Sequence, residues 1–323
     1  MGRAMNQPQM DLSVTVGRIA MANPIATASG CSGYGEELAQ FFNLSVLGAV
    51  VTKSVTLKPR EGHPPPRLAE VRAGLLNAIG LANVGLEAFL AEKLPVLKSY
   101  GVPVIVNVAG STREEYVEVA AALDAAPAVA GIELNVSCPN VKEGGMEFGV
   151  EPRILAGLVE AVRRKVSRAT LIVKLSPNVT DIAVTARAAV DAGAEALSLI
   201  NTLRGLAIDP WKGRPLLTNV VGGLSGPAIK PVALYMVRRV WEEVAGPRGV
   251  AIIGLGGIQF VEDVIEFLRA GATAVSVGTA NFIDPETGPK LVEGLREALG
   301  RLGCRSPRDL VGRLDVPEKK ERM

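Results

Sequence analysis

Short apolar runs alternate along the chain with longer segments in which apolar residues recur at helical spacing. A continuous apolar run bounded by turn residues is typical of a strand that is buried on both faces, as in a parallel sheet. Eight such runs occur: PIATA (24–28), GAVVT (48–52), VPVIVN (102–107), GIELN (131–135), TLIVK (170–174), ALSLI (196–200), VAIIG (250–254) and TAVSVG (273–278). The helical patterns between them include 86–100, 113–125, 152–166, 181–193, 231–244 and 261–271.

This alternation predicts an α/β fold, a parallel (β/α)8 or TIM barrel that forms a single domain over residues 1–323. Two connections, after residue 54 and after residue 202, are much longer than one helix requires. We expect both to fold over the carboxyl end of the barrel, where enzymes with this fold have their active sites. The segment EGHPPPRL (61–68) in the first connection predicts a loop stiffened by proline.

The composition indicates a globular protein that acts on small molecules. The chain has 323 residues, of which 48% are hydrophobic, and a formal net charge of +2. It can therefore bury a large core, and without a dense run of Lys and Arg it has little attraction for nucleic acid or an anionic membrane. No apolar segment of spanning length and no secretory leader is recognisable, which predicts a soluble cytoplasmic protein.

The cysteines argue against a metal centre made by the chain itself. Cys31, Cys138 and Cys304 are far apart, and no Cys-x-x-Cys pair occurs. We therefore expect no disulfide, zinc site or iron–sulfur cluster, so that any redox centre must be a bound cofactor. Cys138 lies in the polar stretch ELNVSCPNVKEGGMEFG (133–149), where a reactive thiol would be found. A strand that simply ends in a loop produces the same pattern.

Polar residues gather at the ends of the predicted strands. Because the carboxyl ends of all barrel strands meet at one mouth, two lysines and three asparagines would converge there, and burying them without a ligand would be costly. The strand ends are Ser29 and Gly30, Lys53 and Ser54, Asn107, Asn135 with Cys138 and Asn140 beyond it, Lys174, Asn201 and Thr202, Gly256 and Gly257, and Gly278 and Thr279.

The last two strand ends predict a phosphate site. GLGGI and SVGTA offer bare backbone N–H groups at consecutive strands, where barrels of this kind commonly bind phosphate. One such motif alone would be weak evidence, because glycine also serves tight turns. Together with the lysines and amides, the two motifs indicate a phosphorylated aromatic cofactor such as FMN across the mouth.

The motifs and their order resemble the class 1 dihydroorotate dehydrogenases, and among them the catalytic subunit of the 1B, NAD-linked type. The resemblance covers nearly the whole chain. Class 2 members have an N-terminal membrane helix and a serine base, neither of which is present here. KEGGMEFG and VNVAG resemble 1B more than the fumarate-linked 1A type. The matching motifs are NPIATASGCSGYGEE, GAVVTKSVT, NAIGLANVG, VNVAGST, IELNVSCPNVKEGGMEFG, VKLSPNVTDI, LINTLRG, GGLSGPAIKP, IIGLGGI and SVGTANF.

The resemblance implies oxidation of dihydroorotate to orotate in de novo pyrimidine (UMP) biosynthesis. Hydride would pass from carbon 6 to nitrogen 5 of FMN, while Cys138 removes the proton from carbon 5 as general base. The implied FMN residues are Ser29, Lys53, Ser54, Asn107, Asn135, Lys174, Ile200, Gly226, Gly256, Gly257, Gly278 and Thr279. The implied substrate residues are Lys53, Asn77, Ala78, Ile79, Gly80, Leu81, Asn135, Asn140, Asn201 and Thr202.

The resemblance also implies a partner subunit with FAD and an iron–sulfur cluster that passes electrons to NAD, around a homodimer of this chain in a heterotetramer. The 1A type remains an alternative, as does a dihydropyrimidine dehydrogenase-like enzyme, which has histidine where Asn140 stands. A Schiff-base aldolase using Lys53 or Lys174 and a non-enzymatic FMN-binding module are further readings. Cys31 and Cys304 are interpreted as packing or surface thiols, and His63 as a loop residue without assigned chemistry.

Overall fold

The computed structural model describes residues 10–137, 139–140 and 146–316. Its centre is a parallel sheet of eight strands in the order β3-β18-β17-β12-β11-β8-β7-β4. A parallel bridge between Ala26 and Ala49 joins the two ends of this order and closes the barrel. The strands are β3 (Ile25–Thr27), β4 (Val50–Val51), β7 (Val104–Val108), β8 (Val129–Asn135), β11 (Thr170–Lys174), β12 (Ala196–Leu199), β17 (Ala251–Leu255) and β18 (Ala274–Val277). All eight predicted runs are therefore barrel strands, and the predicted fold class is confirmed.

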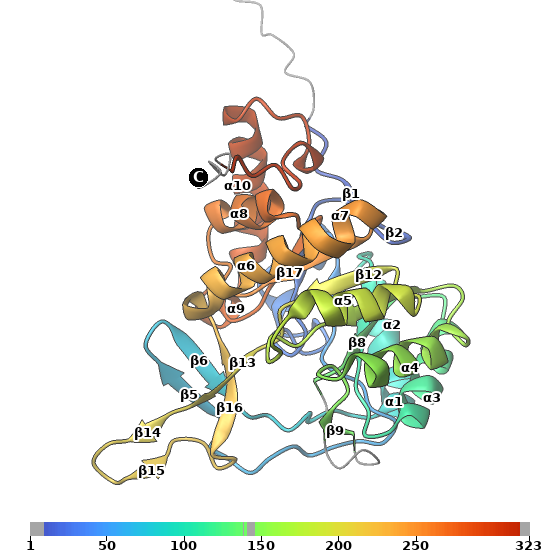
Figure 1. The fold of residues 1–323 in the computed structure, drawn as a ribbon, viewed down its shortest axis with the longest axis vertical. Helices are drawn as coiled ribbons and strands as arrows, with labels where there is room; N and C mark the ends of the chain where they lie inside the picture. The colour runs from blue at the N-terminus through green and yellow to red at the C-terminus, as the bar shows by residue number, and fades with distance from the viewer. Residues whose placement is uncertain (1–9, 138, 141–145, 317–323) are drawn as a thin grey trace, which may run out of the picture.

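Helices surround the sheet (Figure 1), and each predicted helical segment is helical. In α4, Glu151 caps the first turn by accepting from the N–H groups of Arg153 and Ile154, and the helix buries one apolar face against the barrel. The helices are α1 (Leu86–Ala88), η3 (Phe89–Lys93), α2 (Leu94–Ser99), α3 (Arg113–Asp124), α4 (Pro152–Arg163), α5 (Ile182–Asp191), α6 (Lys230–Val240), η6 (Trp241–Ala245), α7 (Gly246–Arg248), α8 (Val261–Ala270), α9 (Ala280–Ile283) and α10 (Thr287–Arg301). Short 3-10 turns are η1 (Leu38–Gln40), η2 (Leu44–Val46), η5 (Pro227–Ile229) and η7 (Pro307–Asp309).

The two long connections meet in one antiparallel sheet of the order β13-β16-β6-β5. From this sheet the hairpin of β14 and β15 projects away from the helices, at the lower left of Figure 1. The predicted loop 61–68 is confirmed except for Leu68, with which β5 begins. The strands are β5 (Leu68–Val71), β6 (Gly74–Asn77), β13 (Leu203–Leu206), β14 (Ile208–Asp209), β15 (Arg214–Pro215) and β16 (Val221–Ser225).

A hairpin of β1 (Val14–Val16) and β2 (Ile19–Met21) fills the amino end of the barrel. Its apolar side chains form one cluster with small inward residues of the barrel strands, among them Ala196 and Ala274. The approach is close, because a Cβ on Gly131 would lie 2.7 Å from the Ile19 side chain. Among the described residues, the amino end of the barrel is therefore apolar and packed, so ligands are expected at the carboxyl end.

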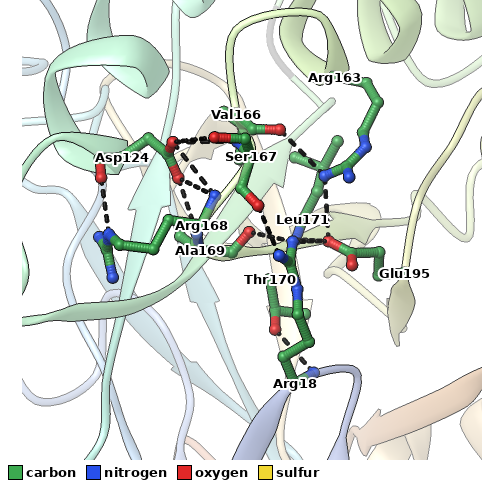
Figure 2. Close-up of polar contacts among 10 residues, drawn as sticks. All are labelled: Arg18, Asp124, Arg163, Val166, Ser167, Arg168, Ala169, Thr170, Leu171 and Glu195. Carbon is green, nitrogen blue, oxygen red and sulfur yellow. Dashed lines mark hydrogen bonds and ion pairs between the residues drawn. The ribbon is translucent and has the colours of Figure 1, made fainter.

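Two buried or half-buried carboxylates fasten the segment that leads into β11 (Figure 2). Asp124, the last residue of α3, accepts from the N–H groups of Ser167, Arg168 and Ala169 at 3.0, 3.0 and 2.7 Å. Glu195 accepts from Arg18 at 2.7 Å, from Arg163, and from the N–H of Leu171 at 3.0 Å. We refer to these side chains with that of Arg168 as the basal network. Figure 2 shows that it ties the β1–β2 hairpin to the barrel.

Candidate active site

The carboxyl ends of the strands and the two long connections enclose two adjoining pockets. The glycine pocket is lined by Gly226, Gly256, Gly257 and Gly278 with neighbouring residues. The amide pocket is lined by Asn77, Asn135 and Asn201 with residues of both connections. The two are continuous, because they share the lining residues Ser29, Cys31, Asn201, Thr202 and Ser225.

Most of the residues that the sequence analysis predicted for the cofactor and substrate sites therefore lie together. Those in the glycine pocket are Ser29, Lys174, Ile200, Asn201, Thr202, Gly226, Gly256, Gly257, Gly278 and Thr279. Those in the amide pocket are Ser29, Lys53, Ser54, Asn77, Ala78, Ile79, Gly80, Leu81, Asn135, Asn201 and Thr202. Asn107 lines neither pocket. Cys138 lies outside the described residues, and Asn140 is described only as part of the short strand β9 (Pro139–Asn140), opposite β10 (Met146–Glu147).

Three glycines of the glycine pocket, Gly226, Gly256 and Gly257, have no room for a side chain. Gly256 and Gly257 have φ angles of +129° and +76°, which favour glycine. A Cβ on Gly257 would lie 2.8 Å from the Lys230 Cβ and 2.9 Å from the Gly226 carbonyl oxygen. In the same pocket, the Thr279 hydroxyl donates to the Ser225 hydroxyl at 2.8 Å. The pocket thus presents bare backbone and hydroxyl groups, the donor set that suits a phosphate.

Two lysines bring positive charge to the pockets. Lys174 is 5% exposed, and its Nζ donates to the Ser29 Oγ at 2.9 Å. Lys53 lines the amide pocket. Among the residues that the structure describes, neither lysine forms an ion pair. A buried ammonium without a carboxylate partner is costly, so Lys174 favours an anionic ligand, and the half-buried Lys53 adds positive charge to the amide pocket.

The amide side chains form a connected network. Asn201 donates to the Asn135 Oδ1 at 3.1 Å and to the Ser137 Oγ at 3.0 Å. Asn178, which the sequence interpretation did not nominate, donates to the Thr202 carbonyl at 3.1 Å. Its only signal in the sequence was its place in SPN, a few residues beyond the end of TLIVK. These contacts fix the orientation of amides that can both donate to and accept from a ligand.

The loop 77–81 borders the amide pocket and contains N–H groups without a partner among the described residues. Gly80 and Leu81 have φ angles of +74° and +57°, and such turns create concave groups of N–H donors that bind anions. Within the described part of the chain, the N–H groups of Ile79, Gly80 and Leu81 donate to no other residue. All three residues line the pocket. A turn with a positive φ at Leu81, whose N–H groups have no partner among the described residues and which lines the same pocket as Lys53, is suited to a carboxylate.

Asn107 and the missed residue Glu133 lie buried within the barrel. Glu133, in the run GIELN, is 1% exposed and accepts from Asn107 Nδ2 and from Ser198 Oγ, both at 2.6 Å. The Asn107 Oδ1 accepts in turn from the Ser54 hydroxyl, and Ser54 lines the amide pocket. The sequence signal that could have identified Glu133 was a carboxylate within an apolar run, because a buried carboxylate normally has hydrogen-bond or ion-pair partners. In this structure Asn107 supports the pocket wall from behind.

Cys31, which the sequence analysis interprets as a packing or surface thiol, lies where the two pockets adjoin. It lines both pockets, and its Sγ lies 3.3 Å from the position that a Cβ on Gly278 would take. Burial raises the pKa of its thiol to about 11, although the charge of Lys174 opposes this shift. Cys31 is therefore a protonated thiol at neutral pH and unsuited to act as a base.

A barrel with a phosphate-type pocket beside an amide-lined pocket at its carboxyl end belongs to the class of barrel enzymes that act on small molecules. Residues 11–299 match the family model for dihydroorotate dehydrogenase, and the chain belongs to this family of oxidoreductases. It is 53% identical to the dihydroorotate dehydrogenase B (NAD(+)) catalytic subunit of Geotalea daltonii over 306 residues, which are 95% of this chain and 99% of the relative. It is 52% identical to the protein of that name from Geobacter metallireducens, with the same shares covered.

The fold of a solved family member agrees. The crystal structure of DHODH in complex with ferulenol from Eimeria tenella superposes with a TM-score of 0.76 at 22% identity. The match covers 97% of this chain and 90% of that chain. At this identity the likeness confirms the fold alone.

Proposed function

We propose that this chain oxidises dihydroorotate to orotate in pyrimidine biosynthesis with FMN as its cofactor. The observation that carries the proposal is the continuity of the glycine pocket with the amide pocket through Ser29, Asn201 and Thr202. One pocket has the donors that suit a cofactor phosphate, and the other has the donors and acceptors that suit a pyrimidine carboxylate. Family membership and the names of relatives about half identical to this chain support the same activity.

The residues present fit FMN. The bare backbone around Gly256 and Gly257, where a Cβ would collide, is suited to the phosphate, and Thr279 and Gly278 complete that end. Lys174, buried and free of ion pairs with described residues, would favour negative charge on the ring system. Ser29, Ile200 and Asn135 would contact the rest of the cofactor. When bound, FMN supplies the hydride acceptor, which the chain's own side chains do not provide.

The amide pocket would hold dihydroorotate by its polar groups. Lys53 and the N–H groups of Ile79 and Gly80 would bind the carboxylate, since charge-assisted bonds are the strong ones. Asn77, Asn135, Asn201 and Thr202, with Asn140, would match the ring N–H and carbonyl groups. The bonds among Asn135, Ser137 and Asn201 limit the rotation of the Asn135 and Asn201 amides, which would hold the ring in one orientation.

Cys138 is the proposed general base for carbon 5. Its chain neighbour Ser137 accepts a hydrogen bond from Asn201 of the amide pocket. An ordinary thiol has a pKa of about 8.5, so the rate of proton removal would rise with pH in the neutral range. The described cysteine at the pockets, Cys31, has a pKa raised to about 11 by burial and does not compete for this role.

The electrons would leave through a partner subunit with FAD and an iron–sulfur cluster that reduces NAD, around a homodimer of this chain in the cytoplasm. The relatives are named catalytic subunits of an NAD(+) enzyme, which supports a partner. Within the described residues, no cluster of side chains that could hold a metal ion occurs. None of the helices in the described part of the chain has the length and apolar character to span a membrane.

Anaerobic bleaching of the flavin tests the proposal. The purified chain should be yellow and should lose its flavin absorbance when dihydroorotate is added without oxygen. A yellow protein that does not bleach would be an FMN-binding module, and a colourless protein trapped by borohydride with its substrate would be an aldolase. Bleaching with dihydrouracil in preference to dihydroorotate would indicate a dihydropyrimidine dehydrogenase-like enzyme. Assays with NAD and with fumarate, each with and without the candidate partner, separate the 1B type from 1A.

A further inference from the structure

The single histidine of the chain, His63, lies against the back of the loop 77–81. Its Nδ1 is 3.1 Å from the Ala78 carbonyl oxygen, and its backbone N–H donates to the Ile79 carbonyl at 3.0 Å. The contact is close, because a Cβ on Gly80 would lie 2.6 Å from the His63 nitrogen and 2.8 Å from its ring. Two consecutive carbonyls of the loop 77–81 are thus bonded to a single residue, His63, of the segment 61–68.

These two bonds set the direction of the N–H groups that follow. In a trans peptide the N–H of the next residue points opposite to the carbonyl. The only cis peptide bonds in the described chain are Pro65–Pro66 and Leu199–Ile200, so both peptides of the loop are trans. With the Ala78 and Ile79 carbonyls held toward His63, the N–H groups of Ile79 and Gly80 point away from it. Both residues line the amide pocket.

We propose that His63 is a positioning residue that orients the N–H groups of Ile79 and Gly80 toward the carboxylate of the pyrimidine ligand. This inference rests on the proposed function, since it names the ligand of the amide pocket. A carbonyl oxygen only accepts, so the His63 Nδ1 carries a proton and donates, in the neutral ring as well as in the charged one. The side chain of His63 therefore orients the loop through a donor bonded to Cγ, and its ring, which packs on Gly80, is tested separately.

Three substitutions separate the donor from the ring. His63→Asn keeps a donor nitrogen bonded to Cγ but removes the ring. His63→Phe keeps a flat ring against Gly80 but has no donor, and His63→Ala removes both. Glu61→Ala, an exposed position of the same loop, is the control for an unrelated change nearby. Flavin content and circular dichroism confirm that each variant is folded.

Two quantities are measured on the FMN-loaded protein. The first is its affinity for orotate, which is monitored through the change in flavin absorption. The second is the concentration of dihydroorotate that gives half the limiting bleaching rate. The side chain supplies the bond to the Ala78 carbonyl, which orients the Ile79 N–H, while the backbone bond to the Ile79 carbonyl remains in every variant. Losing this one neutral hydrogen bond should raise both the orotate dissociation constant and the half-saturating dihydroorotate concentration by about 3- to 10-fold in His63→Phe and His63→Ala. The limiting rate should change less. His63→Asn and Glu61→Ala should stay within about twofold of the wild type.

Amide hydrogen exchange of the peptide that contains residues 76–82 gives a readout that does not depend on activity. It should be faster in His63→Phe and His63→Ala than in His63→Asn and the wild type. Orotate affinity that is unchanged in His63→Phe, or that falls in His63→Asn as far as in His63→Phe, would overturn the positioning role. A wild-type protein that neither binds orotate nor bleaches would instead overturn the proposed function. The comparison of hydrogen exchange would still show whether His63 holds the loop 77–81.

Discussion

Asn107 donates to Glu133 at 2.6 Å within the barrel, and this pair links the buried interior to the wall of the amide pocket. Glu133 also accepts from Ser198, and Asn107 accepts from Ser54. All four side chains are buried. Because a buried donor without an acceptor loses its hydration and gains nothing, the chain of bonds is held together by the carboxylate at its centre.

Replacing Glu133 should therefore reveal what its two oxygens do. Glu133→Ala leaves the Asn107 amide and the Ser198 hydroxyl without an acceptor, and the free energy of unfolding should fall by about 2–5 kcal/mol. Glu133→Gln should cost about 1 kcal/mol or less, because its oxygen can accept from Asn107 while its amide donates to the Ser198 hydroxyl, which can reverse its role. Urea unfolding followed by tryptophan fluorescence measures both. Equal losses in the two variants would mean that the negative charge, rather than the acceptors, is needed.

The positive charge of Lys174 can be tested on the bound flavin. Lys174→Met keeps the apolar part of the side chain and removes the ammonium that donates to Ser29. We expect weaker FMN retention or a lower flavin reduction potential, because the charge that favours the reduced, more negative cofactor is lost. Flavin content after gel filtration and a redox titration give the two values. Lys230→Met is the control, because this lysine is already paired with Asp263 and Glu266.

A Lys174→Met protein with full flavin content and an unchanged potential would contradict this role. A loss in Lys230→Met as large as that in Lys174→Met would mean that packing near the pocket, rather than charge, is responsible. The Lys174→Ala variant, which removes the apolar stem as well, should lose at least as much flavin as Lys174→Met.

The barrel could be predicted because its signal is local. The strands are buried on both faces and appear in the sequence as continuous apolar runs, such as TLIVK. Each strand end carries a polar residue, such as Lys174, or a glycine motif, such as GLGGI. The meeting of the two long connections is not local. Asn77 donates to the Gly223 carbonyl, 146 positions away, and nothing near either residue indicates which strand is its partner. The bonds of His63 and Glu133 were hidden for the same reason, since each depends on a carbonyl or amide brought in by another segment.

The basal network should make the free energy of unfolding depend on pH in the acid range. Burial opposes ionisation of Asp124, but the N–H groups of Ser167, Ala169 and Arg168 and the charge of Arg168 prevail, so the pKa of this carboxyl lies below its ordinary value. A depressed pKa in the folded state gives stability that is present above the unfolded value, about 3.9, and is lost as the pH falls through the folded value.

Asp124→Asn should accordingly lower the free energy of unfolding at pH 7 by about 1–3 kcal/mol, because its amide group meets backbone donors. The difference from the wild type should shrink below pH 4, where the wild-type carboxyl becomes protonated as well. Asp191→Asn is the control, since its ion pair with Arg248 is largely exposed and should contribute about 0–1 kcal/mol. Unfolding curves at pH 7, 5 and 3 give the comparison. A difference that is the same at all three pH values would show that the carboxylate charge plays no part.

Cys138→Ala separates the base from the binding site. FMN should remain bound, because the proposed cofactor residues are on other positions, whereas bleaching by dihydroorotate should slow by about 10² to 10⁴, the usual contribution of a general base. Cys138→Ser should retain activity only toward higher pH, since a hydroxyl gives up its proton far less readily than a thiol. Cys304→Ala is the matched control, a thiol on the C-terminal segment that packs against the core, lines neither the glycine pocket nor the amide pocket and donates to the Leu302 carbonyl. Anaerobic stopped-flow measures the reductive half-reaction without an electron acceptor. If Cys138→Ala bleaches within a few-fold of the wild type across the pH range, the proton at carbon 5 leaves to another group, and Cys138 serves substrate positioning instead.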